Sequence, residues 1–211
     1  MTAACLCIFA KAPVIGQVKT RLTPVLSEKQ ACRVHEGLLQ HCMLQTQSMD
    51  WENQFWATDS SHSYIKKQAR QHGMSLHTQQ GTHLGQRMAF AVKQSLKKFS
   101  YAIIIGTDCP SVDIEVITQA INQLKSGLDV VLSPAVDGGY VLIGFSTLAE
   151  GVFADIEWGS DRVLETTRMR LHDAGLRWSE LATQRDIDRP DDLQYLEQNY
   201  PELYQSICES R

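Results

Sequence analysis

Apolar and polar stretches alternate along the chain, and their spacing predicts a succession of strands and helices. Short apolar runs bounded by turn residues predict strands at residues 5–10, 55–58, 75–79, 101–106, 129–133, 140–145 and 177–181. Apolar residues at helical spacing predict helices at residues 61–71, 84–98, 160–174 and 190–198. Two more helices are expected to begin at Ser27, which forms a capping box with Gln30, and at Ser111. We therefore expect a single α/β sandwich domain over residues 1–211, with a mostly parallel sheet and ligands at the carboxyl ends of its strands.

The composition limits the kind of protein that this can be. With 43% apolar and 21% charged residues in 211, the chain can form one ordinary core. A formal charge of −4 and a pI near 6.0 argue against a nucleic-acid partner. No apolar run approaches the ~20 residues of a membrane-spanning helix, and the N-terminus reads as a buried strand rather than a signal peptide. The six cysteines lack metal-site spacing, so we expect free thiols in a reducing cytoplasm.

Three cations lie in the loop after the first predicted strand. Lys11, Lys19 and Arg21 surround the flexible Gly16, in neither a Walker pattern nor the dinucleotide glycine pattern. Backbone N–H groups freed by a glycine turn, together with Lys and Arg, are what a polyphosphate requires. The loop is therefore a candidate phosphate site, and a solvated basic loop is the alternative.

An aspartate follows the most apolar predicted strand. Asp108 stands where its carboxylate would face the cleft, and a carboxylate there can hold a divalent cation that bridges phosphates. The alternative is a helix cap, for which Ser111 is better placed. On this interpretation Asp108→Asn should change the free energy of unfolding by no more than about 1 kcal/mol.

Two further acidic segments are candidates for the same cleft. The turn Asp137-Gly138-Gly139 predicts a hairpin, and its two glycines would also let a ligand approach the backbone. In the segment at residues 186–193, Asp186 and Asp188 alternate onto one side, which suits a second metal ligand. Asp191 and Asp192 fall in the first turn of a helix, where they complement the helix dipole.

Other catalytic centres are excluded by the motifs that the sequence lacks. No G-x-S-x-G nucleophile elbow occurs, and the seven histidines form no H-E-x-x-H metal motif. Hydrolysis by a serine triad of that type or by a zincin-like zinc site is therefore not expected.

Four motifs together resemble those of a known family. They are FAKAPVIGQVKTRL at residues 9–22, GTHLGQRM at 81–88, GTDCP at 106–110 and DGGY at 137–140, followed by Trp158. In this order they look like the bacterial GT-A-like transferases, described as selenodomain-associated transferase 1 or as arsenosugar-biosynthesis-type glycosyltransferases. The resemblance spans nearly the whole chain and implies the nucleotide-diphospho-sugar transferase fold, with a Rossmann-like three-layer sandwich and a mixed sheet.

The resemblance also implies roles for individual residues. The phosphates would be held by Lys11, Gly16, Lys19 and Arg21, and the base would be read near Gln79, Gln80 and Gly81. A Mg²⁺ or Mn²⁺ ion would be held by Asp108, with Asp188 as a second ligand. Asp108 and Asp137 would be the catalytic residues, and the acceptor hydroxyl or phosphate would enter near Asp137, Gly138, Gly139, Tyr140 and Trp158. The sequence departs from the family pattern in having a single Asp where glycosyltransferases have D-x-D, and Arg189 where related nucleotidyltransferases have a helix-capping Thr.

A second resemblance keeps another reaction open. KTRLTPVLS at residues 19–27 is similar to a stretch of phospholactate guanylyltransferases, which join an NTP to a phosphorylated acid and release pyrophosphate. We therefore expect a metal-dependent glycosyltransferase that uses a nucleotide sugar and a small-molecule acceptor. Nucleotidyl transfer from an NTP is the alternative, and a non-catalytic nucleotide-binding module is a third. Homo-oligomerisation is left open.

Overall fold

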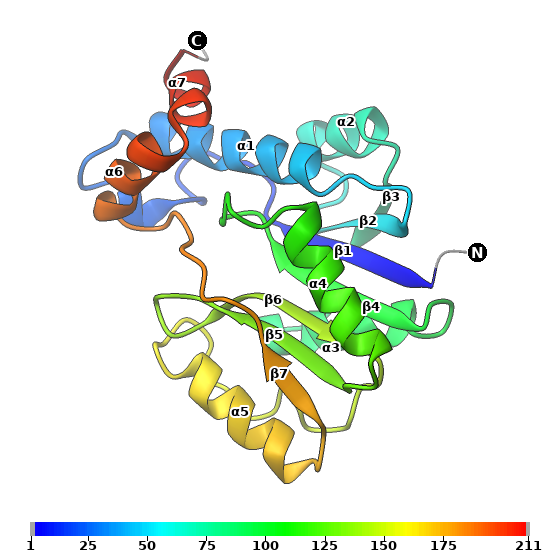
Figure 1. Cartoon of the computed structure of the whole chain (residues 1–211). Helices are drawn as coiled ribbons and strands as arrows, with labels where there is room; N and C mark the ends of the chain where they lie inside the picture. The colour runs from blue at the N-terminus through cyan, green and yellow to red at the C-terminus, as the bar shows by residue number, and fades with distance from the viewer. Residues whose placement is uncertain (1–2, 210–211) are drawn as a thin grey trace.

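The sheet is built outward from β1 (Ala4–Ala10), whose seven residues are all buried. β1 lies between β2 (Trp51–Ala57) and β4 (Tyr101–Gly106) and pairs in parallel with both. A central strand is covered on both faces, which explains why its residues form a nearly continuous apolar run. The computed structural model describes residues 3–209 (Figure 1).

The sheet has seven strands in the order β3-β2-β1-β4-β6-β5-β7. The other strands are β3 (Ser75–Thr78), β5 (Val130–Pro134), β6 (Tyr140–Phe145) and β7 (Trp178–Glu180). β6 runs antiparallel to both β4 and β5, while the remaining pairs are parallel. The predicted α/β fold with a mostly parallel, mixed sheet is therefore confirmed.

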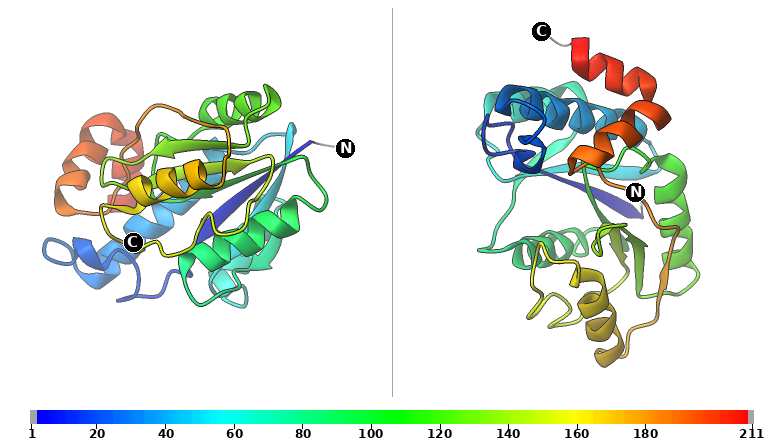
Figure 2. Two further views of the ribbon diagram at one scale, coloured as in Figure 1. Left: turned by 90° about the horizontal axis from the view of Figure 1, so that it is seen from below. Right: turned by 90° about the vertical axis from the view of Figure 1, so that its left-hand side faces the viewer.

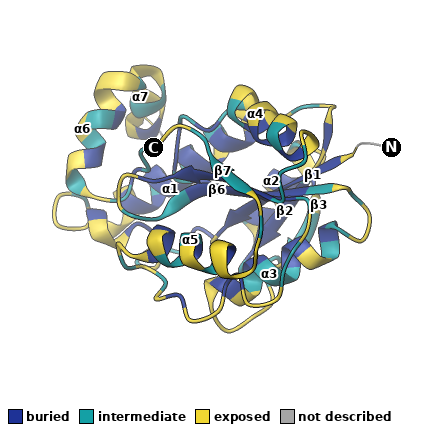
Figure 3. Ribbon diagram, turned by 60° about the horizontal axis from the view of Figure 1, so that its bottom comes forward, coloured by how far each residue is buried: buried dark blue, intermediate teal, exposed yellow. Residues whose placement is uncertain are grey.

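Helices cover both faces of the sheet. On one face lie α1 (Glu28–Gln45), α2 (Ser63–Gln71) and α4 (Ile114–Lys125), and on the other α3 (Leu84–Ser95) and α5 (Val163–Asp173) (Figure 2). Alternate residues of β1 contribute to the two apolar clusters, with Leu6 and Ile8 in one and Cys7 and Phe9 in the other. Buried residues follow the strands and exposed residues follow the outer helix faces, so the molecule has three layers (Figure 3).

A third apolar cluster lies outside the sheet, on the outer side of α1. It joins Leu22, from the short 3-10 helix η1 (Thr20–Leu22), to α6 (Pro190–Asn199) and α7 (Pro201–Glu209). The approach of α7 to α1 explains a glycine within α1, because a Cβ on Gly37 would stand 2.3 Å from Ile207 Cγ1. The prediction of a helix near residue 190 is confirmed, whereas η1 and α7 were not predicted.

The expected helix caps are confirmed in one case and wrong in the other. Ser27 caps α1, and its side chain and that of Gln30 form the predicted capping box. Ser111 does not cap α4; Asp113 does, by accepting a hydrogen bond from Val116 N at 3.0 Å. The helix thus begins two residues later than predicted.

Two expectations from composition can be compared with the described residues. Within residues 3–209 all six cysteines are free thiols, five of them buried and Cys208 exposed. No helix in this part of the chain is long and apolar enough to cross a bilayer.

Candidate functional site

Three segments that are distant in the sequence meet at the carboxyl ends of β1 and β4. The strand-like segment that links β7 to α6 crosses this edge of the sheet (Figure 1). Within it, Ile187 N donates to the carbonyl oxygen of Asp108 at 2.8 Å, and Ile187 O accepts from Lys19 Nζ at 2.5 Å. Ile187 itself is fully buried. The loops after β1 and β4 are therefore fixed to the segment that carries Asp186 and Asp188.

Lys19 is the buried cation of the site. Its side chain is 3% exposed, and Lys19 Nζ lies 2.6 Å from Asp108 Oδ1. The residue precedes η1 with φ 49° and ψ 36°, in the left-handed region that side-chain-bearing residues rarely adopt. Strained residues of this kind persist where the surrounding contacts fix them, and they gather at functional sites.

Asp108 is held as a carboxylate by the cations around it. Its partial burial opposes ionisation, but the charges of Lys19 and His35 and the contact with Lys19 outweigh that effect and lower its pKa. The side chain is 46% exposed, so part of the carboxylate remains open to solvent. Asp108 Oδ1 contacts Lys19 in this structure, and the metal site that the sequence predicts at Asp108 stays a prediction.

Arg21 and Asp188 form a second ion pair beside the first. Arg21 Nη1 and Asp188 Oδ2 are 2.7 Å apart, with Arg21 half-exposed and Asp188 28% exposed. The sequence assigns Arg21 to phosphate and Asp188 to a metal, and the structure brings the two together.

Asp186 is a carboxyl group to which the sequence analysis assigns no separate role. Burial, and then the negative charges of Asp137 and Asp108, raise its pKa to about 6. Lys19 opposes this rise. The negative charges of Asp137 and Asp108 therefore act on Asp186, although the three carboxyl groups come from three different loops. The alternation of Asp186 with Asp188 was the only sequence signal for this position.

Asp192 has a larger role than the helix-dipole effect predicted for it. Its buried carboxylate accepts hydrogen bonds from Arg185 Nε at 2.8 Å, Asp188 N at 3.0 Å and Arg189 N at 2.7 Å. These bonds hold the backbone directly after Ile187 and the side chain of Arg185 before it. The predicted dipole role is therefore incomplete, because Asp192 also holds the segment that carries Asp186 and Asp188.

The Asp137-Gly138-Gly139 turn joins β5 to β6, which confirms the predicted hairpin. Asp137 Oδ1 accepts from Gly139 N at 3.0 Å, and Ala135 N donates to Gly139 O at 2.9 Å. Gly138 has φ +89°, and a Cβ there would stand 2.1 Å from Asp161 O. The backbone of Asp161, and not a ligand, therefore explains the need for glycine at position 138.

A cavity of about 220 Å³ lies between this hairpin and α3. Tyr140 and Trp158, both predicted for the acceptor side, line it together with Asp137, Gly139 and Asp186. Gly138 is not among the lining residues. Burial raises the pKa of the Tyr140 hydroxyl, so it stays protonated at neutral pH. Asp137, Gly139, Tyr140 and Trp158 are thus brought together as expected.

The other residues predicted for the nucleotide side take no part in the two ion pairs. Lys11 has an exposed side chain, and its carbonyl oxygen lies 3.0 Å from His35 Nε2. Gly16 has φ +78° and lies against the carboxylate of Glu28. Gln80 and Gly81 are exposed in the loop before α3.

Gln79, expected beside Gln80 to read a base, has a structural role. Its side-chain amide donates to Trp56 O at 2.9 Å and Ala10 O at 3.2 Å. It therefore ties the ends of β1 and β2 together.

The two carboxylates that the sequence assigns to a metal each contact a cation instead. Among residues 3–209, no group of three or more His, Cys, Asp or Glu side chains is arranged to hold a metal ion. Asp108 and Asp188 nevertheless supply the hard oxygen donors that Mg²⁺ and Mn²⁺ prefer. The donor set therefore suits an ion that takes two protein carboxylates and completes its shell with phosphate and water.

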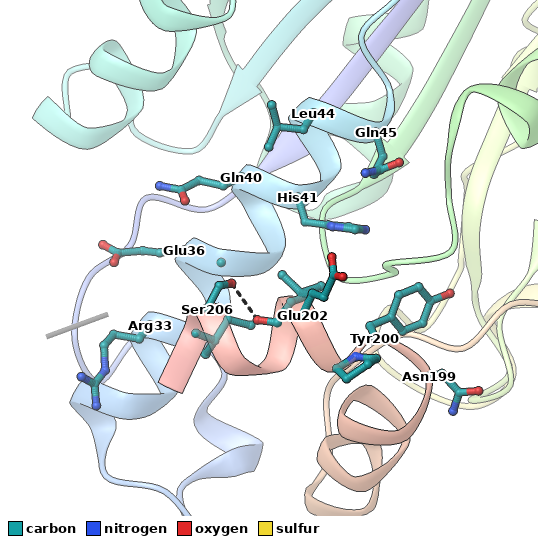
Figure 4. Close-up of a pocket in the computed structure, with 14 residues that line it drawn as sticks. Arg33, Glu36, Gln40, His41, Leu44, Gln45, Asn199, Tyr200, Glu202 and Ser206 are labelled. Carbon is teal, nitrogen blue, oxygen red and sulfur yellow. Dashed lines mark hydrogen bonds between the residues drawn. The ribbon is translucent and has the colours of Figure 1, made fainter. Parts of the chain in front are cut away.

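A larger groove, of about 620 Å³, lies elsewhere, between α1 and α7 (Figure 4). Glu36, Gln40 and His41 project from α1 along one wall, and Tyr200 and Glu202 lie on the other. None of the motif residues lines this groove. The motif residues thus line the cavity of about 220 Å³ and not this groove.

The chain is similar to one known family of proteins. A family described as "Uncharacterized protein conserved in bacteria (DUF2064)" has a model that matches residues 42–160. No curated protein sequence matches the chain.

Solved structures share the fold over nearly the whole chain. A "putative nucleotide-diphospho-sugar transferase" from Desulfovibrio desulfuricans G20 superposes with a TM-score of 0.86 at 24% identity, covering 98% of this chain and 99% of that one. A CMP:2-keto-3-deoxy-manno-octonic acid synthetase complexed with CTP has a TM-score of 0.61 at 13% identity, with coverage of 94% and 98%. A cytidylyltransferase from Leptospira borgpetersenii has 0.60 at 14% identity, with coverage of 99% and 93%. These likenesses establish the nucleotide-diphospho-sugar transferase fold.

Proposed function

The chain belongs to the family of uncharacterized bacterial proteins DUF2064, and from its site we propose that it is a glycosyltransferase. It would take a nucleotide-diphospho-sugar donor and a divalent metal, and it would modify a small-molecule acceptor. The observation that carries the proposal is the pairing of Lys19 with Asp108 and of Arg21 with Asp188 at one edge of the sheet. The description of the D. desulfuricans protein supports the donor class.

The two ion pairs would exchange partners when a polyphosphate binds. Phosphate oxygens are strong acceptors for Lys and Arg, so Lys19 and Arg21 would turn toward the diphosphate. Asp108 and Asp188 would then be released to a Mg²⁺ or Mn²⁺ ion that enters with the nucleotide. When bound, such an ion supplies neutralisation of the negative charge that develops on the leaving phosphate oxygens.

The acceptor would enter from the cavity on the other side of Asp137. Asp137 is exposed at the cavity mouth, where its carboxylate can accept a proton from an acceptor hydroxyl. Lys19 and Arg21 would stabilise the nucleoside diphosphate as it leaves, mainly through fixed charge and positioning. Gln80 and Gly81, exposed before α3, remain the candidates for the base, with Lys11 and Gly16 flanking the phosphates.

Nucleotidyl transfer is the second candidate, because two of the solved relatives are nucleotidyl-transferring proteins by name. The same basic residues would then stabilise pyrophosphate rather than a nucleoside diphosphate. The two reactions differ in the bond that breaks, so their products separate them.

The test is a product assay with the purified protein and Mn²⁺. Four NTPs and a panel of nucleotide sugars are each incubated with a mixture of small acceptors. Release of nucleoside diphosphate supports glycosyl transfer, and release of pyrophosphate supports nucleotidyl transfer. Nucleotide binding without either product would contradict both and favour a non-catalytic binding module.

Metal dependence is tested separately, by measuring how Mn²⁺ and nucleotide affect each other's binding. Mn²⁺ and nucleotide should each raise the affinity of the other by the same factor, as linkage requires. Asp188→Asn should reduce this coupling, whereas Asp191→Asn, an exposed neighbour, should not. Equal coupling in both variants would contradict the assignment of Asp188.

A further inference from the structure

The cavity beside Asp137 is apolar over most of its wall. Phe9 at the end of β1, Met88 from α3 and Ile143 from β6 line it, together with the rings of Tyr140 and Trp158. At about 220 Å³ it matches a compact molecule rather than an extended chain. Cavities of this composition recognise an apolar body and use a few polar groups to orient it.

The only charged groups that line the cavity are acidic. They are the carboxylates of Asp137 and Asp186, and the lining within the described chain includes no Lys, Arg or His. Lys19 and Arg21 are not part of the wall, and each contacts a carboxylate outside it. An anionic ligand would therefore bring a third negative charge to two carboxylates, with no cation in the wall to compensate it.

We propose that this cavity binds an acceptor that has a compact apolar body and an alcohol or amine group, and that carries neither phosphate nor carboxylate. The inference rests on the proposed function and narrows its acceptor class. The apolar body would pack against Trp158, Tyr140 and Met88, and the hydroxyl or amine would face Asp137.

The transfer balances with such an acceptor. The acceptor oxygen or nitrogen forms a bond to the anomeric carbon of the sugar. The bond from that carbon to the diphosphate oxygen breaks, and the nucleoside diphosphate leaves with the electron pair. The proton of the acceptor passes to Asp137 and then to water.

Four probes with one ring and different charges test the proposal. Benzyl alcohol, benzylamine, benzoate and benzyl phosphate are titrated calorimetrically into the full chain, with and without Mn²⁺. Leu84→Trp is designed to fill the cavity mouth, since Leu84 lines the cavity and is 43% exposed. Met49→Trp, at a position that is 93% exposed and remote from the lining, is the matched control.

We expect benzyl alcohol and benzylamine to bind at least ten-fold more tightly than benzoate and benzyl phosphate, in both conditions. Leu84→Trp should weaken the first two at least ten-fold, and Met49→Trp should leave them unchanged. The proposal would be overturned if benzoate or benzyl phosphate bound more tightly than benzyl alcohol and benzylamine, and if Leu84→Trp abolished that binding. Failure of all four probes to bind, or alcohol and amine binding that Leu84→Trp does not change, would also overturn it.

A failure of this proposal can be distinguished from a failure of the proposed function. Nucleoside diphosphates are titrated into the same samples, and under the proposed function they would bind at Lys19 and Arg21, which do not line the cavity. Nucleotide binding with a preference for benzyl phosphate in the cavity would refute only the acceptor class. Alcohol and amine binding without any nucleotide binding would refute the proposed function and leave the cavity specificity intact.

Discussion

Asp108→Asn should destabilise the protein much more than its place at a strand end predicts. The substitution keeps the shape of the side chain but leaves the Lys19 ammonium, 3% exposed, with Ile187 O as its other contact. Removing one partner of a fully buried ion pair costs about 3–5 kcal/mol. The Asp108 side chain is 46% exposed, so water screens part of this cost, and we expect about 2–3 kcal/mol.

A double-mutant cycle measures this effect. The free energy of unfolding in urea is determined for the wild type, Asp108→Asn, Lys19→Met and the double variant. The double variant should be less destabilised than the sum of the two single variants, with a coupling free energy of about 1–3 kcal/mol. A coupling free energy below about 0.3 kcal/mol, or an Asp108→Asn variant as stable as the wild type, would refute the reasoning.

Three further predictions concern the frame around the site. Asp192→Ala removes the acceptor of three hydrogen bonds and should lower the free energy of unfolding by about 2–3 kcal/mol in urea. Asp191→Ala, which is exposed, should lower it by less than about 0.5 kcal/mol, and equal effects would contradict the role of Asp192. Gly138→Ala should fail to accumulate as folded protein or lose several degrees of Tm, because its φ is +89° and its Cβ would meet a carbonyl oxygen; an unchanged Tm would contradict this. Burial lowers the pKa of His35 in the folded state, so the unfolded state, with the ordinary pKa near 6.5, binds the proton more readily. Stability should therefore fall as the pH drops from about 7.5 through 6.5, and His35→Gln, but not His172→Gln, should flatten this dependence in urea titrations at each pH.

The fold could be predicted because local pattern and burial agree along most of the chain. β1 and β4 have apolar residues on both faces, as central strands require. The order of the seven strands was not predicted, because it depends on contacts between distant parts of the chain. α7 could not be predicted, because Ile207 is its only buried residue and its place depends on contact with α1. Ser111 was chosen as a cap by residue type, yet Asp113, two residues later, has the geometry to bond Val116 N.

The convergence of the candidate residues at one edge of the sheet could be predicted from the sequence, and their pairings could not. Lys19, Arg21 and Asp108 follow strands that end at one edge, so their convergence follows from the topology. Which anion each cation contacts depends on how the segment around Ile187 crosses that edge, and its partners lie far away in the sequence. The role of Asp192 was missed for the same reason, since a first-turn Asp is common in helices that hold no loop.

The central claim, that this edge of the sheet is a polyphosphate site, is tested most directly by nucleotide affinity. Calorimetric titration of a nucleoside diphosphate with Mn²⁺ is compared for the wild type, Arg21→Ala, Lys19→Ala/Arg21→Ala and the control Lys67→Ala/Arg70→Ala, which removes the same charge from exposed positions on α2. Charge-assisted contacts are worth about 1.5–3 kcal/mol each, so the affinity should fall about ten-fold or more in Arg21→Ala and further in the double variant. The α2 control should retain the wild-type affinity. Wild-type affinity in Arg21→Ala and in a folded Lys19→Ala/Arg21→Ala variant would contradict the account.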